Sequence, residues 1–75
     1  MSQKSKLAKE LNALENEIKV LESKRSRSMA VIMEAMLSRS IPDETDVQFF
    51  RTFNADIEIK RDQLQKLTKQ LEKLL

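Results

Sequence analysis

Hydrophobic residues recur at alternating spacings of four and three in the first third of the chain, which is the spacing of a coiled-coil seam. This first seam comprises Leu7, Leu11, Leu14, Ile18 and Leu21. The same frame then meets two polar residues, Arg25 and Ser28, inside a short polar stretch. Residues 29–37 follow, and they are apolar on nearly every side of a helix. The pattern predicts one long helix over about residues 4–38, and it leaves open whether that helix continues straight through the polar stretch.

A second seam with the same alternation occupies the last third of the chain. It comprises Phe50, Phe53, Ile57, Leu64, Leu67, Leu71 and Leu74. One position of its frame is polar, Lys60, while Val47, Phe49 and Ile59 lie outside the narrow seam. The pattern therefore predicts a second helix over about residues 44–75, with a first half that is broadly apolar.

The residues between the two seams, about 39–43, have the composition of a turn. They include Pro42, which disfavours helix at the residue before it and suits the first turn of a new helix. The acidic residues that follow, which complement the positive end of a helix dipole, are Asp43, Glu44 and Asp46. Two capping boxes are possible, Ser40 with Asp43 or Thr45 with Gln48, and the sequence does not choose between them. A turn this short makes the two helices antiparallel neighbours.

The fold class that follows is all-α, with residues 1–75 forming a single coiled-coil-like antiparallel hairpin. A chain of 75 residues buries a modest fraction of its surface and is marginal without a staple or a partner. We therefore expect the hairpin to be completed to a helical bundle, either by self-association as a homodimer or by a helical partner in a hetero-complex. The sequence does not say whether that contact is transient or permanent.

The polar interruptions of the two seams meet when the chain is folded about its turn. Residues face each other where their numbers add up to about 82 to 84, because the helices are antiparallel neighbours. This register places Arg25 opposite Glu58, and Glu22 opposite Lys60 and Arg61. We expect these five residues to form a charged layer that fixes the register. The alternative is that their long side chains simply extend to water.

Apolar and charged residues are distributed unevenly between the two ends of the predicted hairpin. The open end, residues 1–28 and 60–75, carries 12 basic and 6 acidic residues, whereas the turn end, residues 29–59, carries 2 basic and 6 acidic residues. The turn end also has more apolar residues than a two-helix contact can cover. Such a patch marks a binding site, and methionine adapts well to the shape of a partner. We expect a partner to bind through Met29, Ile32, Met33, Met36, Val47, Phe49, Phe50, Phe53 and Ile57. The same surface would serve equally well as the core of a homodimeric four-helix bundle.

The chain lacks the residue types on which most enzymatic chemistry depends. Histidine, cysteine and glycine are all missing from the sequence, which removes the usual general base, the usual zinc and haem ligands, any disulfide and any glycine-rich phosphate loop. We therefore expect no catalytic activity, no cofactor, no metal site and no small-molecule substrate. The apolar run of residues 29–37 is interrupted by Glu34 and falls short of the roughly 20 residues that a membrane span requires. The polar N-terminus lacks the pattern of a signal peptide, so we expect a cytoplasmic protein.

Nucleic-acid binding is the alternative to protein binding. Lys24, Arg25 and Arg27 form a short basic run, and a homodimeric helical bundle can bind RNA or DNA along a basic helix face. Acidic residues are interleaved with the basic ones along the first helix, however, and a nucleic-acid footprint is a stripe of one sign. The leading hypothesis is therefore a small chaperone or assembly adaptor that binds a helix at its turn end.

The segment around the turn resembles one family of small helical hairpins. Residues 42–50 read Pro-Asp-Glu-Thr-Asp-Val-Gln-Phe-Phe, an acidic opening followed by a glutamine and an aromatic pair. This segment and the overall length are similar to the helical-hairpin co-chaperones of bacterial type III secretion systems, of the YscE, PscE and EscE type. The resemblance implies a chaperone that keeps a needle-type subunit unpolymerised in the cytoplasm, together with a second, larger chaperone. The seams of leucine at the open end depart from that pattern and favour a more self-sufficient coiled coil.

Overall fold

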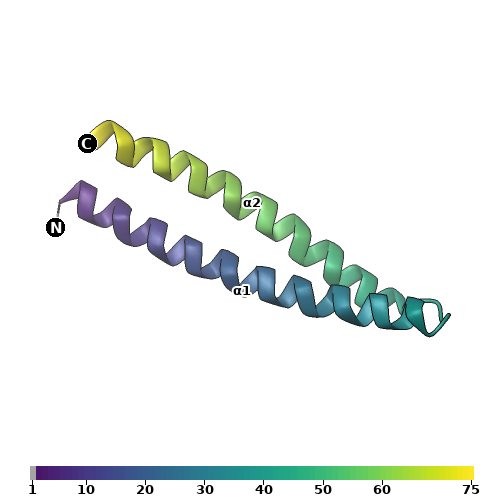
Figure 1. Cartoon of the computed structure of the whole chain (residues 1–75). Helices are drawn as coiled ribbons and strands as arrows, with labels where there is room; N and C mark the ends of the chain where they lie inside the picture. Colours follow the sequence, from purple (N-terminus) through teal and green to yellow (C-terminus); the bar gives the residue numbers. More distant parts are fainter. Residues whose placement is uncertain (1) are drawn as a thin grey trace.

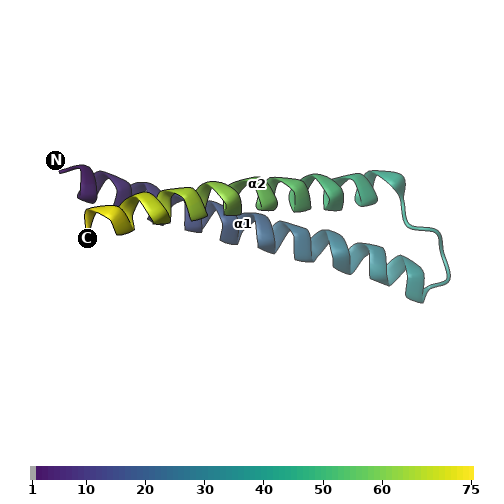
Figure 2. The same ribbon diagram turned by 90° about the horizontal axis from the view of Figure 1, so that it is seen from above.

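Two long antiparallel α-helices make up the fold (Figure 1). The computed structural model describes residues 2–75 and contains α1 (Gln3–Leu37) and α2 (Glu44–Leu74), joined by a short loop. The molecule is a rod with extents of 55 × 16 × 14 Å. Seen from above, in Figure 2, the two helices cross at a shallow angle, and the two chain ends lie together at the end opposite the loop. The predicted all-α hairpin is confirmed, and its helices begin and end within one residue of the predicted positions.

Both ends of α1 have hydrogen bonds that explain where the helix begins and ends. At the N-terminus, the hydroxyl of Ser2 accepts a hydrogen bond from the Ser5 amide at 3.1 Å. At the C-terminus, the Ser40 amide donates to the Ala35 carbonyl at 2.8 Å, and the Arg39 amide donates to the Met36 carbonyl at 3.0 Å. This pair of bonds is the Schellman motif, which requires a left-handed residue just after the helix. Arg39 supplies it, with φ at 58°.

The start of α2 depends on a single aspartate. The side chain of Asp43 accepts a hydrogen bond from the Thr45 amide at 3.1 Å, and its carbonyl accepts one from the Val47 amide at 3.1 Å. Neither of the two capping boxes considered from the sequence supplies the cap. Ser40 is already part of the α1 terminus, and Asp43 stands directly after Pro42 with an extended backbone. The next helical turn can therefore begin at Glu44 with Asp43 as its cap.

The core is a single seam along the length of the hairpin. Its buried members are Leu7, Leu14, Ile18 and Ile57, and Ile57 is fully covered. The remaining seam residues of α1 are half-buried, and they continue the four-three alternation through Leu21, Arg25, Ser28, Ile32 and Ala35. The polar stretch therefore neither bends nor ends the helix, and α1 passes through it as one element. Three of the four buried residues lie at the open end, so the turn end of the hairpin is the less covered half.

Candidate protein-binding surface

The exposed apolar side chains gather at the turn end of the hairpin. Eleven large apolar side chains are exposed within residues 2–75, and eight of them belong to residues 29–59. These eight are Met29, Val31, Met33, Met36, Leu37, Ile41, Phe49 and Ile59. The two nearest the loop are the most exposed, with Leu37 at 84% and Ile41 at 94%. Patches of this kind mark interaction sites in soluble proteins.

One side of the seam carries the methionines, and we call it the methionine flank. Met29, Met33 and Met36 are separated by four and three residues, so they share one face of α1. Met29 and Met33 line an open groove between the helices together with Phe50 of α2. The remaining walls of this groove are Arg25, Ser26, Ala30 and Asn54. The methionine flank therefore offers flexible apolar side chains around a groove whose one end is polar.

The opposite side of the seam carries branched and aromatic residues, and we call it the valine flank. Val20 and Val31 are eleven residues apart, a spacing that returns to the same face of a helix. On α2 this flank continues with Phe49 and Ile59, both exposed. The ring of Phe49 stacks on that of Phe53 with a centroid separation of 6.2 Å and an interplanar angle of 14°. The turn-end surface thus consists of two separate apolar flanks.

The residues predicted to bind a partner are distributed over both flanks and the seam. Met29, Met33, Met36 and Phe49 are exposed, whereas Ile32, Val47, Phe50 and Phe53 are half-buried and keep one edge accessible. Ile57 is different because its exposed fraction is 0%, so the prediction that it contacts a partner is wrong. It falls on the seam, where α1 covers it completely. Seven exposed apolar residues of the described chain lie outside the predicted set, and Val20 and Ile41 are two of them. The eleven-residue spacing of Val20 from Val31 is the signal that could have found the first.

Polar side chains connect the two helices in the middle of the hairpin. Arg61 Nη2 lies 3.1 Å from Glu22 Oε2, which is the pairing that the folded register predicts. Lys60 Nζ lies 3.3 Å from Glu17 Oε2, although the predicted partner was Glu22. These pairs are more than a third exposed on at least one side, so each contributes little to stability on its own.

Arg25 does not pair with Glu58 as predicted. Its Nη1 donates a hydrogen bond to Asn54 Oδ1 at 2.9 Å, and Glu58 is exposed to solvent. Arg25 occupies a seam position, where its guanidinium can reach one helical turn along α2. Glu58 stands one helical turn beyond Asn54 in α2, and its side chain remains exposed. The charged layer therefore consists of three contacts spread over neighbouring levels of the seam.

The basic run of the first helix is divided by the same hydrogen bond. Arg25 is half-buried and its guanidinium is engaged with Asn54, while Lys24 and Arg27 are exposed. These two face the valine flank, where an acidic residue, Glu34, shares the same helix face. A continuous basic stripe, which nucleic-acid binding requires, is not formed by these three residues.

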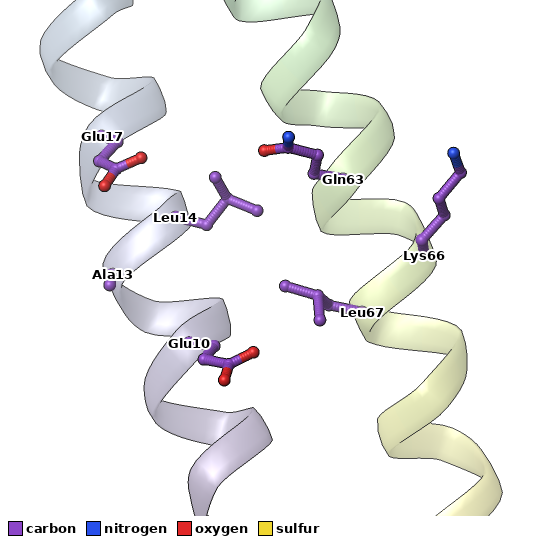
Figure 3. Close-up of a pocket in the computed structure, with 7 residues that line it drawn as sticks. All are labelled: Glu10, Ala13, Leu14, Glu17, Gln63, Lys66 and Leu67. Carbon is purple, nitrogen blue, oxygen red and sulfur yellow. The ribbon is translucent and has the colours of Figure 1, made fainter.

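A second groove lies between the helices at the open end (Figure 3). It is on the side of the valine flank, because Glu17 on its edge stands three residues before Val20. Leu14 and Leu67 point toward each other across it, and Glu10 and Glu17 stand along its α1 edge. Ala13, Gln63 and Lys66 complete the lining. Its floor is the leucine seam, so it is the ordinary furrow between two packed helices, with mixed charges on its rims.

Comparison with known proteins adds no relative: no family model, no curated protein and no solved structure matches the chain. Neither helix of the described residues is long and apolar enough to cross a membrane. The described part of the chain also holds no group of three or more acidic side chains placed to bind a metal ion.

Proposed function

We propose that this chain is a non-catalytic protein-binding module, a small chaperone or assembly adaptor that covers an apolar helix of another subunit. The helix would lie along the methionine flank, in the groove between Met29, Met33 and Phe50. An amphipathic helix in an apolar groove is a common mode of recognition, with anchors at spacings of three and four residues. The observation that carries the proposal is the concentration of exposed apolar side chains at the turn end.

The energetics support a partner of this kind. Met33 is 53% exposed, and Met29 and Met36 are exposed beside it. Fully burying a methionine side chain contributes about 1.5–3 kcal/mol relative to leaving it exposed. Three partly exposed methionines and the edge of Phe50 therefore contribute several kcal/mol to a complex, which is a part of the roughly 8 kcal/mol net that a micromolar affinity requires.

The resemblance of residues 42–50 to the type III secretion co-chaperones adds a possible class of partner. In that setting the covered helix would belong to a subunit that polymerises when it is left alone, and a larger chaperone would share the complex. The groove on the methionine flank is compatible with this setting, and equally with any assembly in which an apolar helix must be kept covered in the cytoplasm.

Site-specific photo-cross-linking in the native host tests the proposal directly. A photoreactive amino acid at position 33 should give one reproducible adduct with a different protein, and the same group at Gln65, exposed on the open half of α2, should not. The protein found in the adduct is then purified. Its affinity for the chain should be abolished by Met33→Asp and by Phe50→Asp, because each substitution places a charge in the apolar groove.

The matched control is Leu74→Asp, which makes the same kind of change at an exposed apolar residue of the open end. This variant should bind with unchanged affinity, and circular dichroism should show that all three variants remain helical. Unchanged affinity in both Met33→Asp and Phe50→Asp would refute the proposal, as would an adduct at position 33 that contains only a second copy of this chain.

A further inference from the structure

The valine flank has a pattern that the proposed partner does not use. Along one face of α1, Arg27 lies four residues before Val31 and Glu34 lies three residues after it. All three side chains are exposed, and Val31 is 46% accessible. An apolar residue is thus flanked almost symmetrically by one positive and one negative charge.

This arrangement is complementary to itself. When two helices meet antiparallel with a two-fold axis at Val31, each Val31 packs on its copy, and each Arg27 falls next to the Glu34 of the other copy. An isologous contact of this kind repeats every pairing twice. Val20 lies eleven residues before Val31 and extends the exposed apolar stripe of this face toward the open end of α1.

The position of Glu34 is a second argument for an external role. It stands in the last turn of α1, where the helix dipole favours a positive side chain and disfavours a carboxylate. Within residues 2–75 neither Glu34 nor Arg27 takes part in an ion pair. The hairpin therefore gains nothing from a glutamate at this position, whereas an antiparallel second copy gives it an arginine partner.

We propose that the valine flank binds a second copy of this chain in an antiparallel, two-fold-symmetric dimer centred on Val31 and joined by reciprocal Arg27–Glu34 pairs. Phe49 stands on the same flank of α2 and adds its exposed edge to the same interface. The stripe carries opposite charges on the two sides of Val31. A second copy of the chain matches this order of charges by symmetry, whereas a helix of another protein has no reason to match it. The inference goes beyond the proposed function, because it leaves the methionine flank of each copy open for the partner helix.

Charge reversal on the full chain tests the dimer, with sedimentation equilibrium measuring its dissociation constant. Arg27→Glu and Glu34→Arg should each weaken the dimer by about tenfold, since each turns two attractive contacts into two repulsive ones. The double variant, Arg27→Glu with Glu34→Arg, should restore the affinity of the unmodified chain, because the pairs are re-formed with their charges exchanged. Glu34→Arg should also leave the hairpin at least as stable as before, since it improves the charge at the end of α1.

Val31→Asp should leave the chain monomeric, and Met33→Asp should leave the dimer intact. The inference is overturned if the chain is monomeric up to concentrations of about 1 mM, if the double variant is as weak as the single ones, or if Met33→Asp rather than Val31→Asp dissociates the dimer. Failure of the proposed function would look different: the charge-reversal results would stand, and no adduct with another protein would form at position 33.

Discussion

At the residue scale, Arg39 is the residue with a strained backbone conformation. It is the residue in the left-handed conformation that closes α1, at φ 58°, in a chain that contains no glycine. A side chain in this region crowds the following carbonyl at a cost of about 1–2 kcal/mol, which glycine avoids. The two hydrogen bonds of the Schellman motif offset that cost.

Arg39→Gly should therefore stabilise the hairpin. We expect the free energy of unfolding to rise by about 0.5–1 kcal/mol, since the relief of strain exceeds the extra freedom that glycine gives the unfolded chain. Urea denaturation followed by circular dichroism measures the change. The matched control is Arg51→Gly, the same substitution at an exposed position inside α2, which should cost about 1 kcal/mol. A loss of stability in Arg39→Gly comparable to that of the control would show that the left-handed residue is not strained.

Sequence reasoning located the loop correctly but did not identify its caps. Pro42 and the acidic residues after it mark the start of α2 because their preferences are local. The choice among Ser40, Asp43 and Thr45 as the cap depends on how the preceding helix ends. The backbone of Ser40 belongs to the end of α1, and α2 begins at Glu44, so Asp43 is the residue at the capping position. That competition is decided between neighbouring segments and is not visible in either one alone.

At the element scale, the two helices share one seam with two charged members, Arg25 and Lys60. Arg25 is engaged with Asn54 and Lys60 with Glu17, so both are satisfied without being fully buried. Polar residues at seam positions lower stability relative to leucine but restrict the alignments that the helices can adopt. Arg25 and Lys60 therefore make the hairpin less stable than leucines would, but they define its register.

Replacing Lys60 by leucine tests this balance. We expect Lys60→Leu to raise the free energy of unfolding by about 1 kcal/mol, because a half-buried seam position gains apolar contact in place of a weak ion pair. Thermal and urea unfolding measure it. The control is Lys66→Leu, an exposed position in the same helix, which should change stability by less than about 0.5 kcal/mol. If Lys60→Leu proved less stable than the unmodified chain, the Lys60–Glu17 pair would be a larger contributor than its exposure indicates.

The register could be predicted from the sequence, whereas the individual polar partners could not. Glu22 and Arg61 meet as the antiparallel pairing requires. Arg25 and Lys60, however, have long side chains that reach about one helical turn along the seam, and each contacts a partner other than the predicted one.

The division of the apolar surface into two flanks was not predicted from the sequence. Phe49 and Phe50 are adjacent in sequence, but successive residues of a helix differ by about 100° in direction, so the two rings serve opposite flanks.

At the scale of the whole molecule, the open end of the hairpin buries more apolar side chains than the turn end. Leu7, Leu14 and Ile18 are buried in the first half of α1, while the turn end has Ile57 as its buried residue. The turn end also carries a net negative charge, because residues 29–59 include 6 acidic but 2 basic residues. A rod with a 16 × 14 Å cross-section has little interior, so the hairpin by itself buries little apolar surface.

The thermal midpoint should therefore depend on the protein concentration. If the chain dimerises through the valine flank, raising its concentration tenfold should raise the midpoint by several degrees, because association stabilises the folded state by mass action. Scanning calorimetry over about 10–500 μM would measure the dependence. Val31→Asp serves as the control, since its midpoint should be the same at every concentration. A midpoint that is constant for the unmodified chain would mean that the hairpin is stable as a monomer.

The uneven packing also sets an order in which the hairpin can fold. Arg25 and Asn54 are 29 residues apart in sequence and Glu22 and Arg61 are 39 apart, and the separation keeps growing toward the chain ends. Closing a longer loop costs more entropy, so contacts near the turn can form earliest. Yet those early contacts bury the fewest apolar side chains. The leucine seam, whose burial contributes most to the stability of the hairpin, forms last. A helix that binds the turn end would supply the missing early contacts, and it would therefore act as a template that speeds the folding of the chain it binds.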